Sequence, residues 1–353
     1  MDNSAQGYDT QLQILEKKII SSNLPPELLE KAKGMIEILK ISLRQAGNYS
    51  NLESVSNYLN VISQIPFAAE TKDNLDLGYA KQVLDKNHYG LNGVKDTILE
   101  YLASLILNLK SGQKANRAPI ICLVGLVGTG KTTLAYSIAQ SMGRNFERIP
   151  LGGMGDARDL RGQSRLYSDA EPGQIIKKMI HSKSKNSVIL LDELDRVTED
   201  ARADIMGVLV ELLDPEQNHA FTDHYVDYPI DLSEVLFIAT VNNTTNIATA
   251  VLDRLELVQM PSYSDQEKFM IGKNYLFPKI SQQSGLPPNL LKIADDVWPI
   301  IVRPLGYDSG IRTLERTIEG ICRKVARLIV EGKVGKNAII TLNSQNITQF
   351  LPH

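Results

Sequence analysis

Residues 125–132 combine glycines, a lysine and a threonine in a spacing that suits the binding of phosphate groups. The segment reads Gly125-Leu-Val-Gly-Thr-Gly-Lys131-Thr132 and matches a P-loop. Glycines let the backbone curve so closely around an anion that its N–H groups point at phosphate oxygens. Lys131 would reach the terminal phosphates and Thr132 would ligate Mg²⁺. We expect the nucleotide to contact Gly125, Leu126, Val127, Gly128, Thr129, Gly130, Lys131, Thr132 and Thr133.

Two adjacent carboxylates, Asp192 and Glu193, directly follow an apolar run at residues 188–191. The carboxyl end of such a strand lies at the sheet edge where a P-loop opens, so both side chains are expected beside the phosphates. Asp192 would contact the nucleotide by holding its Mg²⁺ through water. Glu193 would orient and polarise the water that attacks the γ-phosphate. Together with the P-loop, the pair predicts nucleoside triphosphate hydrolysis.

The central part of the chain has the pattern of a parallel sheet with crossover helices. Apolar runs lie at residues 120–124, 188–191, 235–239 and 255–260. Continuous apolar runs are typical of buried parallel strands, and the segments between them are long enough for helices. A helix is predicted to begin near Lys131, directly after the P-loop. This pattern predicts a doubly wound α/β domain.

Both flanks of this domain are predicted to be helical. Apolar residues recur at helical spacing over residues 10–64 and 94–110. Ser264 and Glu267 are spaced as a capping box, and residues 310–330 form an amphipathic stretch. The expected parts are a helical segment at residues 1–75, the α/β domain at 76–260 and a small α-helical domain at 261–353.

The composition is that of a globular protein, with 43% apolar and 22% charged residues. A formal net charge of −3 gives nucleic-acid binding no support. No run approaches the ~18 apolar residues of a membrane span. Cys122 and Cys322 lie far apart in apolar contexts, which predicts free thiols in the cytoplasm. The histidines and cysteines lack metal-ligand spacing, so the only metal expected is the nucleotide's Mg²⁺.

Three more polar residues follow the acidic pair in an order that resembles the AAA+ ATPases. Asn242 follows the third apolar run, Arg254 lies in Leu-Asp-Arg-Leu-Glu, and Arg312 lies in Gly-Ile-Arg-Thr-Leu-Glu-Arg. The resemblance implies that ATP is the nucleotide and that Asn242 is a polar sensor. It also implies that Arg254 is an arginine finger acting on a neighbouring subunit, and that Arg312 is a second arginine in a helical lid at residues 261–353.

The resemblance narrows to the Lon family of ATP-dependent proteases over about residues 10–351. The stretches that carry it are His88-Tyr-Gly-Leu91, Gly152-Gly153 with Arg161-Gly162, and above all Leu212-Leu-Asp-Pro-Glu-Gln-Asn218 with Phe221-Thr-Asp-His-Tyr225. The resemblance implies that His88 and Tyr89 flank the adenine. It places Tyr167 and Ser168 at the aromatic–hydrophobic pair with which a pore loop grips substrate polypeptide. Leu126 and Val127 stand where Lon usually has two prolines.

The Lon resemblance implies an ATP hydrolase that works in a hexameric ring and unfolds damaged proteins for protein quality control. Substrates would then pass to a Ser-Lys peptidase domain, which we do not expect within these residues. Two alternatives stay open: an unfoldase without a protease, and a nucleotide-gated remodelling factor of the clamp-loader type. The block at residues 212–218 and the lack of a basic stripe argue against the clamp-loader alternative.

Overall fold

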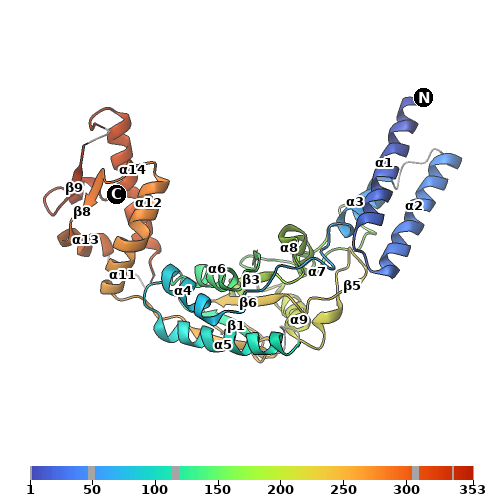
Figure 1. Cartoon of the computed structure of the whole chain (residues 1–353), viewed down its shortest axis with the longest axis horizontal. Coiled ribbons are helices and arrows are strands. Elements are labelled where there is room, and N and C mark those ends of the chain that lie inside the picture. The colour runs from blue at the N-terminus through green and yellow to red at the C-terminus, as the bar shows by residue number, and fades with distance from the viewer. Residues whose placement is uncertain (1, 47–51, 113–118, 304–309, 336–337, 353) are drawn as a thin grey trace.

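The computed structural model describes residues 2–46, 52–112, 119–303, 310–335 and 338–352. The chain follows an arc, with a helical hairpin at one end, an α/β layer in the middle and a helical lid at the other end (Figure 1). Across the described residues, no helix combines the length and apolar character needed to span a membrane.

A parallel sheet of five strands forms the middle of the arc, as the apolar runs predicted. The strands are β1 (Ile120–Val124), β2 (Phe146–Pro150), β3 (Val188–Asp192), β6 (Leu236–Val241) and β7 (Leu255–Gln259), in the spatial order β2-β3-β6-β1-β7. Every residue of β1, β3 and β6 is buried, which explains their continuous apolar character. Because all five strands are parallel, the loops after β1, β3 and β6 open at the same carboxyl edge.

Helices cover both faces of this sheet, which confirms the doubly wound α/β fold. The face that includes Leu123 and Ile238 shares a core with α4, α5 and α6, and the face that includes Phe237 shares one with α8 and α9. These helices are α4 (Leu77–Asn87), α5 (Asn92–Lys110), α6 (Lys131–Met142), α8 (Gln174–Ser182) and α9 (Arg202–Leu213).

The N-terminal part is helical as predicted, although its first helix begins earlier than the apolar spacing indicated. It consists of α1 (Asp2–Ser21), α2 (Pro26–Ala46) and α3 (Leu52–Ile62). The first two helices lie side by side and project from the body (Figure 1). The hydroxyl of Tyr58 in α3 donates to the carbonyl of Val226 at 3.1 Å, which anchors the hairpin to the α/β domain.

The lid is helical, with one short sheet that the sequence did not predict. Its helices are α11 (Asp265–Ile271), a π-helical turn (Gly272–Leu276), α12 (Phe277–Gln283), α13 (Trp298–Val302), α14 (Arg312–Val330) and α15 (Ile347–Phe350). The capping box of Ser264 and Glu267 is present. The short strands β8 (Leu291–Ile293) and β9 (Ile340–Leu342) pair in parallel, and three residues each are too few to show a strand pattern.

Strand β2 was also absent from the predicted strands. Glu147 and Ile149 are buried and Arg148 is exposed, so the strand alternates and lacks a continuous apolar run. As the edge strand of the sheet, it can carry such residues because Glu147 forms an ion pair with Lys178 and a hydrogen bond with His181, both from α8. The remaining short elements are α7 (Arg158–Arg161), α10 (Thr249–Leu252), β4 (Phe221–Thr222), β5 (Pro229–Ile230) and three 3-10 turns (Leu194–Arg196, Asn218–Ala220 and Asp295–Val297).

Candidate nucleotide site

The predicted P-loop joins β1 to α6 in a conformation that depends on two glycines. Gly128 has φ 84° and Gly130 has φ 90°, a left-handed region in which a Cβ is unfavourable. The turn brings the N-terminus of α6 to the mouth of the loop, where its first N–H groups have no helical partners. Thr132 and Thr133 lie exposed in that first turn, and Leu126 is half exposed. A phosphate group fits this arrangement.

Lys131 lies inside the loop with only 8% of its surface exposed. Its Nζ donates to the carbonyl oxygens of Gly125 at 2.5 Å and Leu126 at 3.1 Å, and to Oδ1 of Asn242 at 3.2 Å. Burial lowers the pKa of Lys131, while the nearby carboxylates of Asp192 and Asp195 act in the opposite direction. Phosphate oxygens would be stronger, charged acceptors for this ammonium.

Asp192 ends β3 beside the P-loop, and the residue as a whole is only 4% exposed. Oδ2 accepts a hydrogen bond from Nε of Arg148 at 2.6 Å, and Oδ1 accepts one from the hydroxyl of Thr240. The Thr240 hydroxyl also accepts a bond from the backbone N–H of Glu193 at 2.9 Å. One hydroxyl on the neighbouring strand β6 therefore orients both members of the predicted acidic pair.

Glu193 has a left-handed backbone, with φ 58° and ψ 48°, which is uncommon for a residue with a side chain. Its carboxylate lies against Gly152, in the loop that follows β2. A Cβ built on Gly152 would stand 2.7 Å from Oε2 of Glu193. Because Gly152 has no side chain, the carboxylate of Glu193 has room to lie there. This is a physical reason for glycine at residue 152.

Asn242 is oriented by Asp195, a residue that the sequence analysis did not select. Asp195 is buried, and its carboxylate accepts hydrogen bonds from the backbone N–H and the side-chain Nδ2 of Asn242 at 3.0 and 3.4 Å. The amide oxygen of Asn242 is thereby turned toward Lys131. The only sequence signal for Asp195 was its place three residues after Asp192.

The lid donates hydrogen bonds to backbone carbonyls of the P-loop. The N–H of Ile311 donates to the carbonyl of Gly128 at 3.0 Å, and the hydroxyl of Tyr263 donates to the carbonyl of Thr129 at 3.0 Å. A Cβ on Gly310 would lie 2.5 Å from the carbonyl oxygen of Val127, so the close approach requires glycine. Arg312, the first residue of α14, therefore lies exposed beside the loop.

His88 and Tyr89 lie next to α6, between α4 and α5. Nε2 of His88 is 2.9 Å from the hydroxyl of Ser137 on α6, and the carbonyl of His88 accepts a bond from Nζ of Lys95 at 2.7 Å. Burial lowers the pKa of His88 to about 4, so its ring is neutral at pH 7. Tyr89 packs against the core that α6 shares with α4 and α5.

Arg254 lies at the amino ends of the strands, whereas the P-loop lies at their carboxyl ends. Its carbonyl accepts a bond from the N–H of Ile120 at 3.0 Å, so it sits at the amino end of β1. A five-residue strand spans roughly 17 Å, which separates Arg254 from its own chain's phosphate site. Its guanidinium pairs with Asp214 at 2.7 Å and donates to the carbonyl of Ala250 at 2.6 Å. This ion pair lowers the pKa of Asp214.

Tyr167 and Ser168 lie exposed in the loop between α7 and α8. Tyr167 is 61% exposed and the preceding Leu166 is 94% exposed. The loop is held by local backbone bonds, from the N–H of Tyr167 to the carbonyl of Ser164 and from the N–H of Ala170 to the carbonyl of Tyr167. The ring of Tyr167 therefore faces solvent on a locally ordered loop.

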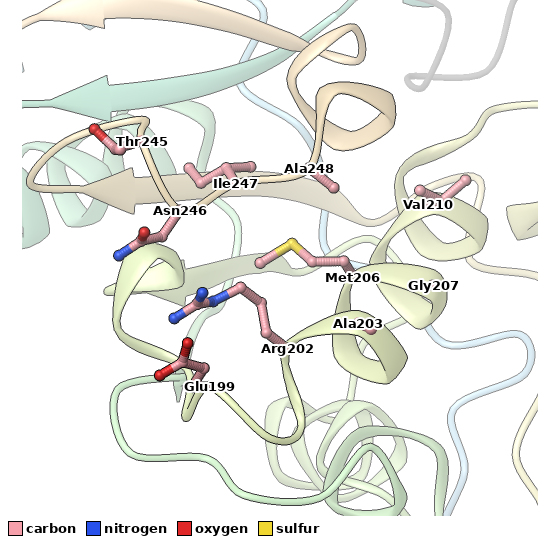
Figure 2. A pocket seen from close by; sticks show the side chains of 10 residues that line it. All are labelled: Glu199, Arg202, Ala203, Met206, Gly207, Val210, Thr245, Asn246, Ile247 and Ala248. Atoms are coloured by element: carbon pink, nitrogen blue, oxygen red, sulfur yellow. The ribbon is translucent and has the colours of Figure 1, made fainter.

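A separate open pocket of about 630 Å³ lies between α9 and the segment at residues 245–248 (Figure 2). Its lining residues are Glu199, Arg202, Ala203, Met206, Gly207, Val210, Thr245, Asn246, Ile247 and Ala248. This lining includes none of the predicted site residues, and the segment at 245–248 leads into α10 and Arg254.

Comparisons with known proteins agree with this architecture. The profile of the ATPase family associated with various cellular activities (AAA) matches residues 121–263. That of the Lon protease AAA+ ATPase lid domain matches residues 282–338.

Three Lon proteases illustrate the similarity along the whole chain. That of Lawsonia intracellularis is 42% identical over 325 residues, which cover 92% of this chain and 38% of that protein. The Clostridioides difficile protein is 42% identical over 95% of this chain and 41% of its own length. The Bacillus thuringiensis protein is 39% identical over 98% and 42%. The chain spans about two fifths of the length of these relatives. With its AAA domain followed by a Lon-type lid, the chain belongs to the Lon family as an AAA+ ATPase module.

Proposed function

We propose that this chain hydrolyses ATP and uses the energy to unfold and translocate protein substrates toward a Lon-type peptidase domain. The observation that supports hydrolysis best is the convergence of four side chains at one edge of the sheet: Lys131 after β1, Asp192 and Glu193 at the end of β3, and Asn242 after β6. Four polar groups at the carboxyl ends of neighbouring parallel strands suit phosphoryl chemistry.

Each residue has a separate part in the proposed reaction. The P-loop N–H groups and Lys131 bind the phosphates, while His88 and Tyr89 flank the adenine. Mg²⁺, held by Thr132 and through water by Asp192, would neutralise charge on the phosphates. A carboxylate and a hydroxyl supply hard oxygen ligands of the type that this ion prefers.

Glu193 and Asn242 orient the attacking water together. Glu193 polarises that water in line with the γ-phosphate, and the amide of Asn242, fixed by Asp195, positions it. Arg312 reaches the phosphates from the lid, while Arg254 acts on the ATP of a neighbouring subunit in a hexameric ring.

Lys131→Ala is expected to weaken nucleotide binding at least about tenfold, because a charge-assisted hydrogen bond to phosphate is lost. Titration of the protein with a fluorescent ADP analogue measures this affinity. Lys185→Ala is the matched control, because that lysine is ion-paired with Glu70 and Glu234, residues with no role in the proposed site. Equal affinities in Lys131→Ala and the parent protein would contradict a nucleotide site at this loop.

The substrates that we propose are unfolded or damaged proteins, contacted by Tyr167. This proposal rests on the Lon membership and on the solvent-facing ring of Tyr167.

The same membership argues against a clamp-loader type of remodelling factor. We place the motor in the cytoplasm, where Cys122 and Cys322 would stay reduced; burial raises the pKa of each thiol, to about 12 and about 11.

Tyr167→Ala is expected to leave basal ATP hydrolysis unchanged and to slow the degradation of folded substrates severalfold, in a protein that joins this module to a Lon-type peptidase domain. Aromatic side chains supply much of the contact area in protein recognition. The degradation rate should therefore fall only for folded substrates, which the motor must unfold by pulling on the chain. Short unstructured peptides should still be cleaved. Tyr79→Ala removes a partly exposed tyrosine elsewhere and serves as control. Normal degradation of folded substrates would remove Tyr167 from substrate gripping.

A further inference from the structure

Arg148 is bonded to the carboxylate proposed to hold Mg²⁺. Its Nε donates to Oδ2 of Asp192 at 2.6 Å. The other carboxylate oxygen, Oδ1, is bonded to the Thr240 hydroxyl. Oδ1 is thus engaged by a neutral hydroxyl and Oδ2 by a charged guanidinium, so a magnesium-bound water at Oδ2 would have to share that oxygen with Arg148.

The position of Arg148 on β2 keeps it near the phosphate site. Arg148 aligns with Leu190 on β3, two residues before Asp192, so both charged side chains lie on the sheet face that α6 covers. Two residues along β2, the ring of Phe146 packs edge-on against Tyr136 of α6, with centroids 5.5 Å apart. This contact fixes β2 relative to the helix that begins at the P-loop.

The two partners differ in their exposure. The side chain of Asp192 is 6% exposed, whereas that of Arg148 is 49% exposed. The carboxylate therefore stays in place, while the guanidinium is free to turn outward into water. Two cations near one buried carboxylate repel each other, so a metal at Asp192 and the guanidinium of Arg148 weaken each other's binding.

We propose that Arg148 competes with Mg²⁺ for Oδ2 of Asp192 and thereby sets the Mg²⁺ concentration at which the nucleotide binds tightly. The proposal rests on the proposed nucleotide site. Arg148 is a positioning residue: it holds the Asp192 carboxylate ready, and it turns outward when the metal complex enters. The P-loop itself makes no contact with Arg148 in this scheme, so nucleotide binding without metal does not depend on the arginine.

Arg148→Met tests this competition, because methionine keeps an unbranched side chain without the charge. The binding of a fluorescent ADP analogue is measured in EDTA and then at increasing Mg²⁺. In Arg148→Met, the Mg²⁺ concentration that gives half of the increase in affinity should fall about fivefold, which corresponds to ~1 kcal/mol for an ion pair whose guanidinium is half exposed to water. Affinity in EDTA should equal that of the parent protein.

Arg158→Met is the control, because Arg158 is a half-exposed arginine paired at 2.5 Å with Asp156, a residue with no role in the proposed site. Arg148→Gln provides a second, polar variant should the methionine fail to fold, and the same fall is expected. An unchanged or higher Mg²⁺ midpoint in the Arg148 variants, with the parent's Mg²⁺ dependence intact, overturns the proposal. A parent protein that binds nucleotide equally with and without Mg²⁺ would instead contradict the metal site, and the competition with it.

Discussion

Arg254→Ala is expected to lower ATP turnover in the assembled protein about 1000-fold, the size of effect that an arginine finger supplied in trans has. Nucleotide affinity should change little, because Arg254 lies at the amino end of β1 and cannot reach the P-loop of its own chain. An arginine in that position can act on ATP only across an interface between two copies.

Mixing two inactive variants tests the interface directly. Arg254→Ala subunits keep an intact P-loop, and Lys131→Ala subunits keep an intact finger, so mixed rings should recover some phosphate release while neither variant alone does. Turnover per subunit in the parent protein should rise with protein concentration, because assembly follows mass action.

Asp214→Ala separates the catalytic effect from a structural one. This variant loses the ion pair with Arg254 but keeps the arginine, so its turnover should stay far above that of Arg254→Ala. If the two variants lose the same activity, the pair is structural and the finger hypothesis is wrong. A flat specific activity over all protein concentrations, with no rescue on mixing, would contradict it as well.

Glu193→Gln should lower turnover about 100-fold, which is the usual size of a general-base contribution, and should keep nucleotide affinity. Glutamine has the same shape and leaves the backbone bond from residue 193 to Thr240 in place. It cannot accept a proton from the attacking water. Phosphate release and nucleotide titration on the same sample separate the two effects.

Glu199→Gln is the matched control for this experiment, because Glu199 lines the separate pocket (Figure 2), whose lining includes none of the predicted site residues. Its turnover should equal that of the parent protein. Glu193 would have no part in the reaction if Glu193→Gln hydrolysed ATP at the parent's rate.

The sequence predicted those parts of the fold and site in which a single segment carries the information. Strands β1, β3 and β6 were predicted because they are buried and mostly apolar. Strand β7 was predicted from its leucines and valine, although Glu256 interrupts them. The P-loop was predicted because its glycines and Lys131 are contiguous. Strand β2 was missed, since this edge strand carries charged residues such as Glu147, which pairs with Lys178 of the neighbouring helix α8.

The supporting residues of the site could not be predicted from the sequence. Thr240, Asp195 and Arg148 act through partners on other strands or turns, and no local spacing connects them with those partners. Threonine at the end of an apolar run and arginine on a strand are ordinary surface or packing residues in isolation. Only the register of parallel neighbours turns them into a network around Asp192.

The two hydrogen bonds from the lid to the carbonyls of Gly128 and Thr129 have a thermodynamic consequence. Phosphate binding depends on the shape of this loop, and the loop is bonded to Ile311 and Tyr263. Nucleotide affinity and lid angle are then linked quantities, and the linkage is reciprocal. A force or partner that shifts the equilibrium between two lid orientations must change the affinity for nucleotide. Nucleotide binding must change that orientation equilibrium by the same factor.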